Sequence, residues 1–172
     1  MRGGLERRRP DDAFYRVQLC AQGLRAQAEL AADARDNDDD DAVRGQLHSA
    51  RGLLAAARRA AAEAAPVTPN AAGWRALAEC EYERARGEAR PEGWSQAAAV
   101  WDQLDRSPLA AYCRWRQAEA LASAGASPAD TGVPLRDAYD VATRLGAVPL
   151  LRELEQLAGR ARIDLSPVDA PA

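Results

Sequence analysis

Apolar residues recur every three or four positions along most of the chain, from about residue 11 to about residue 162. This spacing places them on one face of an α-helix, which turns once every 3.6 residues. Prolines, glycines and a run of aspartates divide the pattern into segments. We expect about seven amphipathic helices, at roughly 11–35, 41–64, 70–86, 91–104, 108–124, 135–145 and 149–162.

The predicted boundaries follow from residues that start or stop helices. Pro91, Pro108 and Pro149 suit a first helical turn, where the missing N–H has no partner to lose. Glycine closes three other segments, because it adopts the left-handed conformation common after a helix: Gly87, Gly125 and Gly146. Residues 126–134 contain Gly132 and Pro134 and are predicted to form a loop or a short helical turn.

The composition supports an all-α fold. Alanine, the strongest helix former, provides 41 of the 172 residues, whereas there is only one phenylalanine. A sheet would need many β-branched and aromatic residues, and these are scarce here. The formal net charge of −3 gives no general attraction to nucleic acid or to an anionic membrane.

A weak internal repeat refines this prediction. The segment 74–87 aligns with the segment 112–125, so that Glu81 matches Glu119 and each copy ends in glycine. The two copies are offset by 38 residues (112 − 74). An offset of this size is typical of tetratricopeptide-like or HEAT-like arrays of paired antiparallel helices. We therefore predict an antiparallel helix-pair solenoid in one domain over 11–165, with a flexible tail at 1–10 and a tail or linker remnant at 166–172.

The acidic run from Asp36 to Asp41 invites comparison with a calcium loop. An EF-hand also needs glycine at its sixth position and glutamate at its twelfth, where this chain has Asp41 and Leu47. We interpret the run as a solvated loop that caps the following helix. The single histidine, His48, lies just off an apolar stripe and is predicted to be a partly exposed helical residue.

Other candidate groups also have structural explanations. Glu79, Glu81 and Glu83 are spaced by two, so on a helix their side chains diverge. Arg116 and Glu119 are predicted to form a surface pair. The four tryptophans are assigned to core packing, with an aromatic ligand-binding groove as the alternative.

The cysteines and the lack of long apolar runs suggest a cellular setting. Cys20, Cys80 and Cys113 are odd in number and lack a CxxC spacing, so we expect small reduced thiols within helices. The sequence has no apolar run of about 20 residues and no apolar segment of a signal peptide near its start. We predict a cytoplasmic protein that needs no metal or cofactor.

The second half of the chain resembles a known family. The segments GWSQAAAVWDQLDRSPLAAY (93–112), YCRWRQAEALASAG (112–125) and ATRLGAVPLLRELEQLAGRARIDL (142–165) are similar to the helical region of large actinobacterial LuxR-type transcriptional regulators. In that family a tetratricopeptide-like region follows an AAA/STAND-like ATPase and precedes a helix-turn-helix. The resemblance covers about residues 15–165 and is strongest over 94–165.

The resemblance implies the sensor or relay segment of such a regulator, without its ATPase and DNA-reading parts. The sequence has no G-x-x-x-x-G-K-[ST] motif, and it ends where the family's helix-turn-helix would begin. Residues 118–145 also do not fit a helix-turn-helix, because that motif needs a turn of three to four residues and the predicted loop is about twice that length. The helix after the loop carries Asp137 and Asp140 and few donors for base edges.

We therefore expect a non-catalytic scaffold that binds a protein partner, a neighbouring domain of the same regulator or a small ligand, and not nucleic acid. Two alternatives are left open: a self-associating module such as a homodimer, and the remnant of a truncated regulator gene without independent activity. The sequence assigns no catalytic, cofactor-binding or metal-binding residue.

Overall fold

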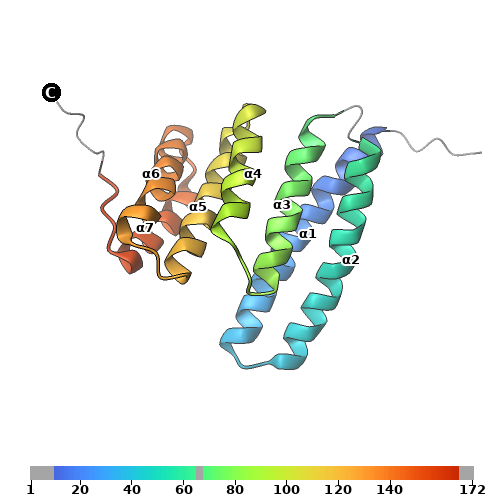
Figure 1. Ribbon diagram of the computed structural model, residues 1–172, viewed down its shortest axis with the longest axis horizontal. Coiled ribbons are helices and arrows are strands. Elements are labelled where there is room, and N and C mark those ends of the chain that lie inside the picture. Colours follow the sequence, from blue (N-terminus) through green and yellow to red (C-terminus); the bar gives the residue numbers. More distant parts are fainter. Residues whose placement is uncertain (1–9, 65–67, 167–172) are drawn as a thin grey trace, which may run out of the picture. The chain divides into compact units, whose positions relative to one another are not determined.

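The computed structural model describes residues 10–64 and 68–166, and the regular structure in this part of the chain consists of seven α-helices (Figure 1). Their bounds are α1 Pro10–Asp36, α2 Asp40–Ala64, α3 Asn70–Ala85, α4 Pro91–Gln103, α5 Ser107–Ser123, α6 Pro128–Leu145 and α7 Val148–Ala161. The predicted fold class, all-α with about seven helices, is confirmed. Among the described residues, no helix is long and apolar enough to cross a membrane.

The chain divides into two compact units, Met1–Glu88 and Ala89–Ala172. In the first unit α1 and α2 form a long antiparallel pair, and α3 packs against both of them. In the second unit α4 packs on α5, α5 on α6, and α7 contacts both α6 and α5. One domain over 11–165 stays a prediction.

Alanine forms most of the buried faces. The first unit buries Val17, Leu24 and Leu54 among alanines of α1 and α2, whereas the second buries Leu135 and Leu154. All four tryptophans are at most 6% exposed, which favours the core-packing interpretation. The spacing of Leu145 from Leu135, Ala138 and Ala142 predicts that it shares their buried face, but at the end of α6 it is 53% exposed.

Helix ends share one hydrogen-bond pattern. After α3 the Glu88 amide donates to the Glu83 carbonyl at 3.0 Å, and after α5 the Ala126 amide donates to the Leu121 carbonyl at the same distance. This six-to-one bond is the Schellman motif, which needs a left-handed residue before the donor. Glycine supplies it at Gly87, Gly125 and Gly146, as predicted, whereas Asp38, Asp105 and Arg162 adopt positive φ without glycine's freedom.

The prediction for residues 126–134 needs correction, because helix α6 already begins at Pro128. The Ser127 side chain accepts a hydrogen bond from the Asp130 amide at 3.1 Å, and its hydroxyl donates to the Asp130 carboxylate at 2.6 Å. This reciprocal capping stabilises the first turn of the helix. The helix then continues through Pro134, where one backbone donor is missing.

The same correction removes one argument against a helix-turn-helix. The connection between α5 and α6 spans only residues 124–127, which is a permitted turn length for that motif. The chemistry of α6 still disfavours DNA reading, because its exposed residues include Asp130, Asp137 and Asp140, whose charge would face phosphate.

Two glycines of the second unit allow a matched test of backbone conformation. Gly146 has a φ of +62° and Gly159 lies within α7, and a Cβ added at either would meet no atom within 4 Å. We expect Gly146→Ala to lower the free energy of unfolding by about 1 kcal/mol, since alanine is strained in the left-handed region. Gly159→Ala should raise it by up to about 1 kcal/mol through helix propensity.

Urea unfolding followed by tryptophan fluorescence measures both changes. Equal effects of the two variants would contradict the assigned backbone conformations.

Candidate functional site

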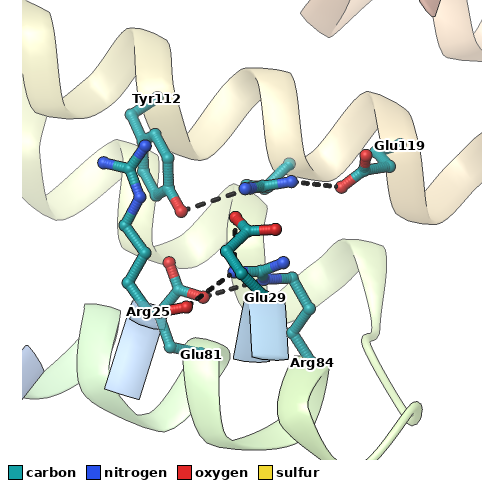
Figure 2. Close-up of polar contacts among 7 residues, drawn as sticks. Arg25, Glu29, Glu81, Arg84, Tyr112 and Glu119 are labelled. Atoms are coloured by element: carbon teal, nitrogen blue, oxygen red, sulfur yellow. Dashed lines mark hydrogen bonds and ion pairs between the residues drawn. The ribbon is translucent and has the colours of Figure 1, made fainter. Parts of the chain in front are cut away.

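Buried charge is the most unusual chemical feature of the described residues. Glu81 of α3 is fully buried and Arg116 of α5 is 4% exposed, whereas the other charged side chains in the described ranges are half-buried or exposed. A buried charge is costly unless it is paired and hydrogen-bonded. Each is the centre of a network within its own unit, and Figure 2 draws both networks.

The network of the first unit links α3 to α1. Arg84 Nε donates to Glu81 Oε2 at 2.8 Å, while its Nη2 donates to Glu29 Oε1 at 3.1 Å and to the Arg25 carbonyl at 3.3 Å (Figure 2). Glu81 and Arg84 are one helical turn apart, so their side chains lie on the same side of α3. The guanidinium therefore neutralises the buried carboxylate and joins the two helices.

Arg35 of α1 adds a contact at the C-terminal end of the same interface. Arg35 donates one hydrogen bond to the Ala31 carbonyl at 3.2 Å and another to the Ala85 carbonyl at the end of α3. A cation there is favoured by the partial negative charge of the helix C-terminus. Its guanidinium also lies 3.6 Å from where a Cβ on Gly87 would stand.

The network of the second unit combines an arginine with aromatic rings. Arg116 Nε donates to the Tyr112 hydroxyl at 3.2 Å, and Nη1 donates to Glu119 Oε2 at 2.7 Å (Figure 2). The Arg116 guanidinium carbon lies 3.9 Å from the centre of the Trp115 ring, a stacked cation–π contact. The Tyr112 ring meets the rings of Trp94 and Trp115 edge-on, at 6.1 and 5.6 Å.

This network corrects the sequence-based interpretation of Arg116 and Glu119. The spacing of three residues correctly predicts an ion pair, but the arginine is buried and not at the surface. The residues around it contained a usable signal, because Tyr112 lies one turn before Arg116 on the same helical face and Trp115 directly precedes it. An arginine among aromatics on a core face is the type of cation that can be buried by stacking.

Another arginine holds α5 to its neighbours. Arg114 makes a bidentate pair with Asp102 of α4, at 3.2 and 2.6 Å, and its Nε lies 3.6 Å from an Asp137 oxygen of α6. The hydrogen bond from Arg114 to Asp102 raises the pKa of Arg114, although burial opposes the change. The group was already charged, so the bond contributes to helix register and not to proton transfer.

The residues considered in the sequence occupy unremarkable positions. His48 is exposed on α2, and Asp39 caps α2 by accepting a hydrogen bond from the Ala42 amide at 2.9 Å, which confirms the capping role of the acidic run. Cys80 and Cys113 are buried, whereas Cys20 is half-buried and burial raises the pKa of its thiol. The described residues hold no group of three histidine, cysteine, aspartate or glutamate side chains suited to a metal.

Together the networks position helices and neutralise charge. Every carboxylate in them accepts a hydrogen bond from an arginine, so its lone pairs are directed at a fixed cation. Sequence reasoning missed Glu81 as a buried group, since three glutamates spaced by two do not reveal which one faces inward.

The pair in the first unit predicts a non-additive response to substitution. Arg84→Met removes the Arg84 guanidinium from the buried Glu81 carboxylate and should lower the free energy of unfolding by about 3 kcal/mol. The double variant Glu81→Leu, Arg84→Met removes both charges and should cost clearly less than Arg84→Met alone. Urea denaturation of the three proteins tests this, and additive costs would show that the pair is not coupled.

Comparisons of the chain with family models, with curated proteins and with solved structures found no match.

Proposed function

We propose that this chain is a non-catalytic helical-repeat scaffold, the sensor or relay segment of a LuxR-type transcriptional regulator that binds a partner domain or a small ligand. One structural observation carries the proposal. In both units a helix pair is followed by a third helix that packs against both members: α3 on α1 and α2, and α7 on α5 and α6. In helix-pair repeats, each pair packs in the same way against the helix that follows it in the chain.

The family resemblance adds the biological setting. Its strongest part, residues 94–165, falls within the second unit, and the Ala142–Leu165 segment that carries it includes α7 and the end of α6. Within the proposal the chain works in the cytoplasm, and reading of DNA is left to another part of the regulator, since α6 exposes aspartates.

The absence of catalysis in the proposal rests on how the titratable groups are used. Glu81 and Glu119 are bound to arginines, and burial raises the pKa of the Cys20 thiol, which lowers its thiolate fraction. These groups serve packing and pairing, which suits a scaffold.

Binding to the corresponding ATPase tests the proposed role. The purified full chain is titrated calorimetrically with the P-loop ATPase segment of each LuxR-type regulator encoded in the same genome. We expect saturable binding to one of them and a changed rate of ATP hydrolysis, with a P-loop ATPase of unrelated architecture as the control. No binding to any of these segments, together with unchanged reporter transcription after deletion of the gene, would overturn the proposal.

Self-association is the second candidate, and an exposed apolar stripe on α1 favours it. Tyr15, Leu19 and Leu30 lie on the outer side of α1, and Leu19 is 69% exposed. Exposed apolar residues that line up on one helix face are common at protein interfaces. A homodimer through this face would cover them.

Sedimentation equilibrium at micromolar concentration tests that alternative. If α1 forms the contact, Leu19→Glu should give a monomer. Val133→Glu on α6 is the control, because Val133 is 61% exposed and lies on another helix, and it should leave the dimer intact. A strict monomer for the unmodified chain would eliminate the alternative, and dissociation by Val133→Glu alone would move the contact to α6.

A further inference from the structure

A cavity of about 400 Å³ lies between α2 and the beginning of α3, within the first unit. The buried Ala61 forms its floor, and the exposed alanines Ala62 and Ala72 and the half-buried Thr68 are also part of the lining. Arg58, Arg75 and Glu79 complete the lining. The volume is near the lower end of the range of about 300–1,000 Å³ found for small-molecule sites.

The charge of this lining is unbalanced. Arg58 Nε donates to Glu79 Oε1 at 3.2 Å, which uses the carboxylate and leaves the terminal nitrogens of Arg58 available. Arg75 is exposed and makes no hydrogen bond or ion pair with any other described residue. Two guanidinium groups therefore face one carboxylate, which gives a local excess of positive charge in a chain whose formal net charge is −3.

The positive potential comes from the two arginines and not from the backbone. Pro69 occupies the N-cap position of α3 without a side-chain cap, but the Ala71 and Ala72 amides donate to the Thr68 and Pro69 carbonyls at 3.0 and 3.1 Å.

We propose that this cavity binds a small organic monoanion: a carboxylate that carries a compact apolar body. The Arg75 guanidinium, with two donors in one plane, matches the geometry of a carboxylate, and Arg58 adds a second cation. The alanine floor accommodates the apolar body, which a free inorganic anion lacks. The inference rests on the proposed function for its biological meaning, as it would give the sensor segment its ligand.

Benzoate is a suitable probe, because it joins one carboxylate to one small ring. The full chain is titrated with benzoate while amide chemical shifts are followed by NMR. We expect saturable shifts in α2 and α3, with acetate and benzyl alcohol each at least tenfold weaker. Either control binding as tightly as benzoate would overturn the proposal, and so would the lack of saturation.

Substitutions locate the site. Arg75→Gln should raise the Kd for benzoate about tenfold, whereas Arg51→Gln, the same change two turns before Arg58 on α2, should leave it unchanged. Ala72→Leu places a larger side chain in the lining of the cavity and reduces its volume. It should abolish binding although both arginines remain. Circular dichroism melts confirm that each variant is folded.

Equal Kd values for the Arg75 and Arg51 variants would show that benzoate responds to net charge alone, which overturns the proposal. The ATPase titration is independent of this outcome: partner binding without benzoate binding rejects only the ligand site, and the reverse result rejects only the relay role.

Discussion

The small size of the alanine side chain is the constraint on which the rest of this structure depends. Alanines occupy most buried positions, and a helix lined with them approaches its neighbour closely. Each alanine, however, removes little apolar surface from water, at about 25 cal/mol per Å². Stability must then be concentrated at a few large side chains, and Trp94 and Trp101, both 1% exposed, provide it in the second unit.

Arginine side chains also stabilise the packing of these alanine-lined helices, by bridging one helix to the next. A long side chain can cross from one closely packed helix to a carboxylate or carbonyl on the next while its methylene groups cover apolar surface. Arg84 and Arg35 do this between α1 and α3, and Arg114 does it between α4, α5 and α6. Because these bonds need defined partners, they select the register of helices whose alanine faces would otherwise slide with little penalty.

Much of the fold follows from local signals in the sequence. The seven helices, the glycines after α3, α5 and α6, and the burial of the tryptophans were predictable because each depends on residues close together in the chain. The start of α6 was missed for a local reason as well. Gly132 and Pro134 predict a break in the helix, but Ser127 and Asp130 cap it before that point. A proline inside a helix removes one hydrogen bond, and a helix that is already nucleated continues past it.

The candidate site was less predictable, because its properties are not local. Periodicity places Glu81 and Arg116 on helices, but burial depends on which helices pack around them. The cavity illustrates the same limit: Arg58 and Arg75 are 17 positions apart in sequence and line one cavity only because α3 packs against α2.

The two units also carry different kinds of information about function. The second unit holds the segment that resembles a regulator family, and its buried arginine contacts Tyr112, Trp115 and Glu119. The first unit resembles that family mainly in composition, yet it has the cavity with surplus positive charge. Family-specific residues and ligand-specific residues need not coincide in a sensor, since a relay must preserve contacts with its regulator while its ligand pocket is free to vary. The polar groups that stabilise the packing are satisfied by one another, whereas a ligand needs groups that the fold leaves unused, and Arg75 is such a group among the described residues.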